Sequence, residues 1–470
     1  MNKLFKSTLI YTTITISQKT ISLLLIPAYT RFVKPEELGL FSVIQSYSAF
    51  FIVLISFGLD ESALYFLEKD RSNPKLLHKR LSNTLTFYLL IASSIILISL
   101  SIALFTDWVK IDVISASAIV WIISAPFYQL FQKMLRVQAE PMKHALFIAS
   151  YSIAQTFLIV LLVFVFELQS KGLLAAFALT SVSYAIYAVI KLTARFRINL
   201  EFGILTKIFS FSKHIYLNHI TSWGLSNLLV VSLGFFSSNF DVGIYTALSI
   251  FSLLFIEFSK ISINAFQPFF YRNLASLSGR IQVKNIVVLL TIASTILAIF
   301  VFLLSKLYYH IIIGSIYSSG KELVSTIVLL GVLNFIILII DQIASFRKST
   351  VKLVSRATVF GFLMNLILIL CFQNIYDLEL ALHLLSVATF SSILLKCYIV
   401  GRDLLGGYGI LNNLLLSVVV ILALVLFKDS FDKVMQILSL LIGYLLCVYV
   451  LNRKLVLALF TLQFNHGKNS

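Results

Sequence analysis

The chain has 470 residues, of which 59% are hydrophobic and only 12% are charged, and its mean hydropathy is +0.97. A soluble protein of this size carries about 25% charged residues, so the composition excludes a soluble globular fold and indicates a polytopic membrane protein. The net charge is +17. In a membrane protein such an excess reflects orientation in the bilayer, so it does not point to nucleic acid as a partner.

Apolar segments of about 20 residues recur along the whole chain, and each is long enough to cross a bilayer as a helix. Their hydropathy does not alternate as it would in the strands of a membrane barrel. We therefore predict an all-α fold with about fourteen transmembrane helices. The expected spans are 7–30, 38–66, 82–105, 113–132, 145–166, 173–191, 214–236, 243–266, 285–305, 324–345, 355–373, 379–399, 412–427 and 434–451.

The basic residues predict how the helices are oriented. If the N-terminus is cytoplasmic, roughly three of every four lysines and arginines fall on the cytoplasmic side, Lys396 among them. This bias places both termini in the cytoplasm and requires an even number of spans. No cleavage site of small residues follows the first apolar segment, so we expect it to be a retained helix.

The first span has a polar face. Its members follow one another at steps of three and four residues: Thr8, Thr12, Thr15, Lys19 and Ser22. A lysine near the middle of a span costs roughly 2.5–3.5 kcal/mol on insertion scales, so this face should meet protein or water. The turn at 32–37 should end this helix and start the next, because a proline followed by acids suits a helix N-terminus.

A weak internal repeat joins two parts of the chain. The segment PEELGLFSVIQS at Pro35–Ser46 resembles NFDVGIYTALSI at Asn239–Ile250, and Gly39 aligns with Gly243. Six spans separate the copies, which predicts two parallel six-helix halves around a central cavity. We therefore assign 1–195 to an N-terminal bundle and 196–400 to a C-terminal bundle. The remainder, 401–470, should hold two additional helices and a cytoplasmic tail.

Polar residues inside the spans are the candidate site. Glu257, Lys260 and Asn264 share one helical face, and the repeat aligns Asn264 with Asp60. Several cations in one cavity suit an anionic cargo, because phosphate oxygens removed from water need charged donors. The predicted cargo-binding cations are Lys19, Arg31 and Lys260. The residues predicted to line the cavity or to take part in ion coupling are Thr15, Asp60, Asn218, Asn227, Glu257, Asn264 and Asp341.

Each candidate also has a simpler explanation. Glu257 and Lys260 could neutralise each other across one helical turn. The Lys19 side chain could extend to the membrane surface. Arg31 could be an ordinary interfacial anchor, and Asp60 and Asp341 could simply mark the end of a span.

The sequence contains no catalytic constellation, nucleotide-binding motif or cysteine pattern typical of metal binding. We therefore expect a transporter with no cofactor and no bound metal. Its energy would come from an ion gradient, the membrane potential or the gradient of the cargo. Whether protons or sodium ions are coupled stays open.

Two stretches resemble a known family. IPAYTRFVKPEELGLFSVIQSY and the later SNFDVGIYTALSIFSLLFIEFSKISINAFQPFFYRNL are similar to signatures of bacterial polysaccharide-export flippases, including the O-antigen (Wzx-type) flippases. These belong to the multidrug/oligosaccharidyl-lipid/polysaccharide (MOP) exporter superfamily. The resemblance extends to about Ser392 and implies a cavity cation at Arg31. Many relatives carry an Asp-Arg pair where this chain has Leu229-Val230, with Asn227 as the nearest polar residue.

The resemblance implies transport of an undecaprenyl-pyrophosphate-linked oligosaccharide, such as an O-antigen or capsule repeat unit. The cargo would pass from the inner to the outer leaflet of the bacterial cytoplasmic membrane by alternating access. Membrane lipids, a polysaccharide polymerase and a chain-length regulator are the implied partners.

Two other functions remain open. A cation-coupled multidrug exporter on the same fold would need a cavity rich in carboxylates. A membrane glycosyl polymerase or ligase would need a large outward loop with basic residues, and the longest one here, 306–323, carries only Lys306 and Lys321.

Overall fold

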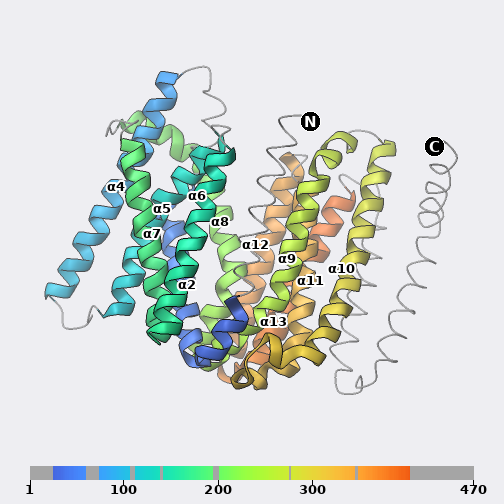
Figure 1. Cartoon of the computed structure of the whole chain (residues 1–470). Helices are drawn as coiled ribbons and strands as arrows, with labels where there is room; N and C mark the ends of the chain where they lie inside the picture. Colours follow the sequence, from blue (N-terminus) through green and yellow to red (C-terminus); the bar gives the residue numbers. More distant parts are fainter. Residues whose placement is uncertain are drawn as a thin grey trace, which may run out of the picture. The chain divides into compact units, whose positions relative to one another are not determined.

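The computed structural model describes residues 25–59, 74–105, 112–137, 141–193, 201–274, 277–344 and 348–402. Every regular element within these ranges is helical (Figure 1). In chain order the elements are α2 (Pro35–Ser56), α4 (Pro74–Phe105), α5 (Val113–Val137), α6 (Pro141–Ile159), η1 (Val160–Val165), α7 (Gln169–Thr193), α8 (Phe202–Phe236), α9 (Asn239–Asn273), α10 (Leu277–Ile312), η2 (Ser315–Leu323), α11 (Val324–Ala344), α12 (Lys348–Phe372), η3 (Gln373–Ile375) and α13 (Leu378–Val400).

Within the described ranges, ten helices are long and apolar enough to cross a membrane. This finding confirms the prediction of an all-α polytopic membrane protein. The predicted span 214–236 lies in α8, where Ser226–Phe236 is a shorter apolar stretch among the residues whose side chains are described. The spans 412–427 and 434–451, and most of 7–30, lie outside the described residues. The total of fourteen spans and the cytoplasmic placement of both termini therefore stay predictions.

Two helices differ in length from the sequence-based expectation. Helix α2 ends at Ser56 and not near residue 66, because Phe57 (φ 46°) and Gly58 (φ 65°) adopt the left-handed conformation that terminates helices. Helix α8 begins at Phe202, twelve residues before the predicted span, and contains no proline that would interrupt it. Its 35 residues correspond to a length of about 50 Å.

The start of α8 is attached to α4. The backbone N–H of Glu201 donates a hydrogen bond to the Asn83 side-chain oxygen, and Lys79 Nζ lies 3.1 Å from a Glu201 carboxylate oxygen. The Asn83 amide in turn donates to the Lys79 carbonyl oxygen at 2.8 Å. The first N–H groups of a helix have no hydrogen-bond acceptor within the helix. At the start of α8, the Glu201 N–H has its acceptor on the neighbouring helix α4.

The chain packs as two compact units, residues 1–246 and 247–470. The sequence repeat predicts a boundary between the two halves near residue 195. That boundary concerns the repeat and not the packing, so it stays a prediction. By packing, α8 and the first two turns of α9 belong with the N-terminal helices.

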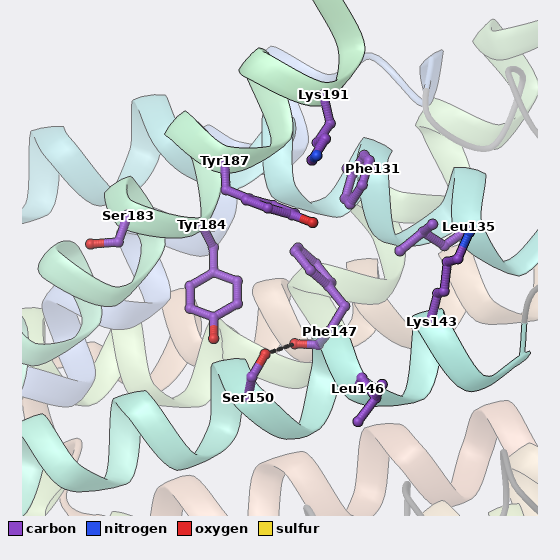
Figure 2. Close-up of a pocket in the computed structure, with 10 residues that line it drawn as sticks. All are labelled: Phe131, Leu135, Lys143, Leu146, Phe147, Ser150, Ser183, Tyr184, Tyr187 and Lys191. Atoms are coloured by element: carbon purple, nitrogen blue, oxygen red, sulfur yellow. Dashed lines mark hydrogen bonds between the residues drawn. The ribbon is translucent and has the colours of Figure 1, made fainter. Parts of the chain in front are cut away.

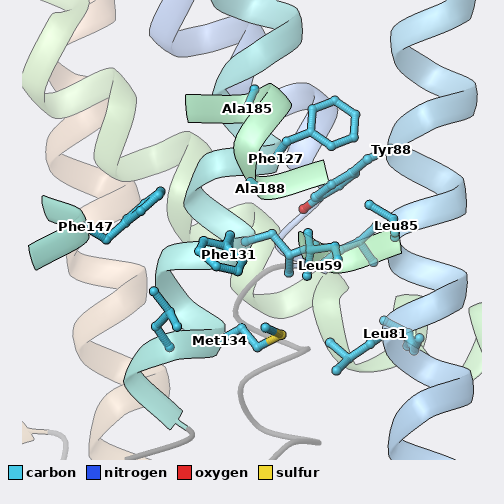
Figure 3. Packing of buried hydrophobic residues seen from close by; sticks show 14 residues of the cluster. Leu59, Leu81, Leu85, Tyr88, Phe127, Phe131, Met134, Phe147, Ala185 and Ala188 are labelled. Atoms are coloured by element: carbon cyan, nitrogen blue, oxygen red, sulfur yellow. The ribbon is translucent and has the colours of Figure 1, made fainter. Parts of the chain in front are cut away.

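The first unit is organised around a cluster of apolar side chains from α4, α5, α6, α7 and α8 (Figure 3). The Tyr88 hydroxyl group, which lies within it, donates to the Ser56 carbonyl oxygen at 3.3 Å and so links α4 to the end of α2. The buried members of the cluster are Leu59, Leu81, Leu85, Tyr88, Phe127, Leu130, Phe131, Met134, Leu135, Phe147, Ala185, Ala188, Leu192 and Ile208.

Small residues allow α5 and α7 to approach closely. Ala125 and Ala178 are buried between them, and the Ser124 and Ser181 hydroxyl oxygens are 2.6 Å apart. Apolar burial supplies little attraction between helices that lie in lipid, so close packing and hydrogen bonds of this kind hold the pair together.

The two copies of the repeat meet within the first unit. Helices α2 and α9 begin at equivalent positions, Pro35 and Asn239. A Cβ atom added to Gly39 would lie 1.7 Å from the Asn239 carbonyl oxygen, and one added to Gly243 would lie 1.9 Å from the Pro35 carbonyl oxygen. Only glycine fits at either place, so the backbones of the two helices are in direct contact.

Polar side chains extend this relationship. Ser42 and Thr246, which are 204 positions apart and aligned in the repeat, have hydroxyl oxygens 2.8 Å from each other. The equivalent acids Glu37 and Asp241 each accept a hydrogen bond from a serine, Ser170 and Ser237 respectively. Because the two segments exchange roles across the contact, a local two-fold axis relates them.

The second unit has α11 at its centre. Sixteen of its residues are buried. The Phe255 ring of α9 packs against Gly331, and a Cβ atom added to this glycine would lie 2.6 Å from the ring. Gly361 of α12 faces Ser392 of α13, whose hydroxyl group donates to the Ala357 carbonyl oxygen at 2.9 Å. Glycine and serine again mark the places where helices lie closest.

We predict that Gly39→Ala and Gly243→Ala each destabilise the folded protein by about 1–3 kcal/mol, because the added methyl group forces two backbones apart. Thermal unfolding of the full chain in detergent would reveal this as a lower melting temperature. The matched control is Gly203→Ala in α8, where an added Cβ meets nothing within 4 Å. Equal melting temperatures for all three variants would contradict the described contact.

Candidate functional site

The predicted site residues fall into three groups. Lys19, Thr15 and Asp60 lie outside the described residues. Asn218 and Asn264 are described only by their backbones, which lie in α8 and α9. The side chains of Arg31, Asn227, Glu257, Lys260 and Asp341 are described and are taken in turn below.

Arg31 lies at the end of the helical segment 25–32, directly before the turn that leads to α2. It is exposed, and α2 begins at Pro35 with Glu36 and Glu37 in its first turn, as the sequence predicts. The backbone N–H of Lys34 donates to the side-chain oxygen of Gln169 at 3.3 Å. Together with the hydrogen bond from Ser170 to Glu37, this contact attaches the turn to the start of α7. The turn thus holds Arg31 at the surface of the first unit, and its role as a cargo cation stays a prediction.

Asn227 lies in α8, one turn after Trp223, which contacts α2. Its amide nitrogen donates to the Trp223 carbonyl oxygen at 3.1 Å. The Trp223 indole N–H donates to the Ser46 carbonyl oxygen of α2 at 2.9 Å, and its ring centroid lies 4.6 Å from that of Phe50. The nearby Leu229 and Val230 are buried, so apolar packing occupies these two positions.

Glu257 and Lys260 form an ion pair on the surface of α9. The Lys260 Nζ atom lies 2.9 Å from a Glu257 carboxylate oxygen, one helical turn away. The lysine side chain is 45% exposed and the glutamate side chain is 16% exposed. The two charges therefore neutralise each other while the lysine remains accessible.

Asp341 forms a second ion pair, within the second unit. Lys396 of α13 places its Nζ atom 2.8 Å and 3.0 Å from the two carboxylate oxygens of Asp341 on α11. Lys396 is completely buried, whereas the Asp341 side chain is 40% exposed. The lysine charge thus lies in the interior of the unit, and a carboxylate that remains partly accessible neutralises it.

Lys396 is the residue that the sequence-based prediction missed, because it was counted with the basic residues of the inner surface. A signal was present, since the lysine lies within the apolar segment 378–400 and not in the connection after it. A lysine that is completely buried needs a partner, and the nearby aspartate on a neighbouring helix supplies one.

We predict that Asp341→Asn strongly lowers the amount of folded protein, because it leaves the buried Lys396 charge without a carboxylate. Breaking a buried pair on one side costs about 3–5 kcal/mol. Lys396→Met removes the buried charge itself, so the double variant Asp341→Asn/Lys396→Met should recover much of the loss. Melting temperature and membrane abundance measure both effects.

The control for this cycle is Lys352→Met, which removes an exposed lysine from α12. We expect a change within about 0.5 kcal/mol for this variant. If the double variant were as unstable as Asp341→Asn, the pair would not account for the loss.

Comparison with known proteins identifies a family for the chain. The family model described as "Polysaccharide biosynthesis protein" matches residues 4–274, which is more than half of the chain. No curated protein matches the chain.

Several solved structures share its fold. The lipid II flippase MurJ in an inward closed conformation superposes with a TM-score of 0.68 at 14% identity, over 95% of this chain and 100% of that one. An inward-facing multidrug resistance MATE family transporter of the MOP superfamily gives 0.60 at 14% identity, over 88% and 96%. A mutant of the Vibrio cholerae MATE transporter VcmN gives 0.54 at 14% identity, over 85% and 97%.

The matched structures and the apolar helices described above together show a multi-pass membrane protein whose fold is similar to those of MurJ and the MATE transporters. The family match covers both copies of the repeat and the glycine contact between them. The chain belongs to the polysaccharide biosynthesis protein family.

Proposed function

We propose that this protein is a flippase that moves a lipid-linked oligosaccharide from the inner to the outer leaflet of the bacterial cytoplasmic membrane. The cargo would be an oligosaccharide joined through pyrophosphate to undecaprenol, such as an O-antigen or capsule repeat unit. Membership of the polysaccharide biosynthesis family and the fold shared with a lipid flippase support this assignment.

The charge balance of the described side chains carries the choice of cargo. Of the carboxylates predicted to line the cavity, Glu257 is paired with Lys260 and Asp341 is paired with Lys396. Neither pair leaves a net negative charge to attract a cation. The other cations predicted for the cavity are Lys19 and Arg31, and the other predicted carboxylate is Asp60. Two cations to one acid in this predicted set suit a pyrophosphate group.

The exposure of the two paired lysines suggests different roles. Lys260 is 45% exposed, so a phosphate oxygen could replace the Glu257 carboxylate as its partner. Lys396 is completely buried, which favours a structural role. In the proposed transport cycle Lys19, Arg31 and Lys260 hold the pyrophosphate, the sugar occupies the cavity and the polyprenyl tail stays in lipid.

On this proposal the protein is a transporter that catalyses no covalent reaction. It would depend on an ion gradient, the membrane potential or the cargo gradient, with proton or sodium coupling as the open question. Its cargo would come from membrane glycosyltransferases and would pass to a polysaccharide polymerase and a chain-length regulator.

A cation-coupled multidrug exporter is the second candidate, because MATE transporters share the fold. A cationic drug or ion would need a carboxylate, and the 40% exposed side chain of Asp341 is the one it could reach most easily among the described acids of the candidate set. On this alternative Asp341 would matter for transport and the cavity lysines would not.

We predict that Lys19→Ala and Lys260→Ala each lower flipping about tenfold to a hundredfold, because each removes a charge-assisted contact to pyrophosphate. In cells that depend on this gene, lipid-linked repeat units should accumulate in the inner leaflet and surface glycan should fall. Immunoblotting of membranes would verify that each variant is present at the normal level.

Two further variants sharpen the test. Lys352→Ala removes an exposed lysine from α12 and should leave surface glycan unchanged. The exchange Glu257→Lys/Lys260→Glu keeps the pair neutral but moves the cation one turn, so it should reduce flipping while preserving stability.

Normal surface glycan in both single alanine variants would refute the proposal. Loss of cationic dye export in the double variant Asp341→Asn/Lys396→Met, at a normal membrane level, would favour the drug exporter.

A further inference from the structure

A pocket of about 730 Å³ lies in the first unit between α5, α6 and α7 (Figure 2). It is formed by the end of α5, the beginning of α6 and the end of α7, which are the ends that the charge bias assigns to the cytoplasmic side. The residues that line it are Phe131, Leu135, Lys143, Leu146, Phe147, Ser150, Ser183, Tyr184, Tyr187 and Lys191.

The apolar wall of the pocket is held in place by aromatic packing. The Phe147 ring lies 5.2 Å from Phe131, 5.3 Å from Tyr184 and 6.1 Å from Tyr187, measured between ring centroids. Figure 2 shows the Phe147 ring in the middle of these neighbours. Rings that support one another on three sides need little rearrangement when a ligand binds, so the pocket is preformed.

The charged side chains among the described residues that line the pocket are both basic. Lys143 and Lys191 are both exposed, and no carboxylate is present among the described residues that line it. Lys191 Nζ lies 5.6 Å from the centroid of the Tyr187 ring, and Figure 2 shows this side chain directed toward the aromatic residues. The pocket therefore combines two cations with an aromatic and aliphatic wall.

The surface beside the pocket is apolar. Leu146 at its edge is 63% exposed, and Ile153 and Phe157 continue the exposed apolar face of α6. Ile186 and Ile190 do the same on α7. Both helices are long and apolar enough to span a membrane, so these side chains face lipid acyl chains in the bilayer.

We propose that this pocket binds an anionic phospholipid of the inner leaflet. The phosphodiester group would lie between Lys143 and Lys191, and an acyl chain would follow the wall formed by Leu146 and Phe147 toward the apolar face of α6. The volume lies within the range of about 300–1,000 Å³ that small-molecule sites occupy.

The apolar wall distinguishes this ligand from free phosphate. Inorganic phosphate would use the two lysines alone and would leave the aromatic side of the pocket empty. A phospholipid uses both parts, and basic residues close to a cytoplasmic membrane surface attract anionic lipids. The site is separate from the cations proposed to hold the cargo, so it would serve lipid dependence and not cargo recognition.

The test is native mass spectrometry of the purified full chain, titrated with phosphatidylglycerol or with phosphatidylcholine of the same acyl chains. We expect phosphatidylglycerol to bind more tightly than phosphatidylcholine. The double variant Lys143→Gln/Lys191→Gln should weaken phosphatidylglycerol binding roughly 30-fold. It should weaken phosphatidylcholine binding much less, because the choline cation offsets the charge of that phosphodiester.

Two variants separate the parts of the site. Ser150→Trp should fill the apolar side of the pocket with a large ring and leave its charge unchanged. In the described contacts the Ser150 hydroxyl group donates only to the Phe147 carbonyl oxygen of its own helix, so the change breaks no contact between helices. It should therefore also weaken phosphatidylglycerol binding. The matched control is Lys171→Gln, which removes an exposed lysine at the opposite end of α7 and should have no effect.

Three results would overturn the proposal. Equal affinity for the two phospholipids would mean that the lysines do not select an anion. Displacement of phosphatidylglycerol by an equal concentration of inorganic phosphate would mean that the wall contributes nothing. Stronger displacement by undecaprenyl phosphate than by phosphatidylglycerol itself would assign the pocket to the carrier lipid of the proposed cargo.

Discussion

The direct contact between two helix backbones at Gly39 and Gly243 determines how the first unit is built. Side chains normally hold helix axes 8–10 Å apart, and their absence here lets the beginnings of α2 and α9 touch. Since α8 leads directly into α9, the contact also lays α8 along α2. The Trp223 indole N–H then donates to the Ser46 carbonyl oxygen. A Cβ atom added to Gly234 would lie 2.8 Å from the Val43 side chain, so these helices also lie close together there. This arrangement explains why the compact unit extends to residue 246 and does not end with the sixth predicted span.

The described helices satisfy their polar groups in three ways. Many serine and threonine hydroxyl groups donate to a carbonyl oxygen one turn earlier in the same helix, as Thr180 and Ser386 do. Glu257 and Lys260 pair within one helix, and Asp341 and Lys396 pair between two. Each arrangement lowers the cost of placing polar atoms in an apolar phase, where an unsatisfied group costs several kcal/mol. The functional interest of Lys260 follows from the difference between the two ion pairs, since the exposed lysine can change partners and the buried one cannot.

Long apolar segments are strong signals, and for this reason the sequence predicted the helical membrane fold and most helix positions. The turn before α2 was also predictable, because Pro35 and the two acids after it have a clear preference for a helix start. The end of α2 was not, since the left-handed conformation of Phe57 is an uncommon one for a bulky residue. The weak repeat aligned Gly39 with Gly243, but periodicity within one helix cannot reveal which distant backbone a glycine faces. Lys396 was missed for a related reason, because its burial depends on a partner 55 positions away.

The glycine contact has a property that a contact between unrelated surfaces lacks. Each copy of the repeat supplies both of its parts: a glycine that accepts the neighbouring backbone, and a carbonyl oxygen four residues earlier that fills the space of the missing side chain. A segment with this design is complementary to itself. Two separate polypeptides, each with a single copy of the repeat, could therefore form the same backbone contact as a symmetric dimer. The geometry needs nothing that depends on both copies being part of one chain.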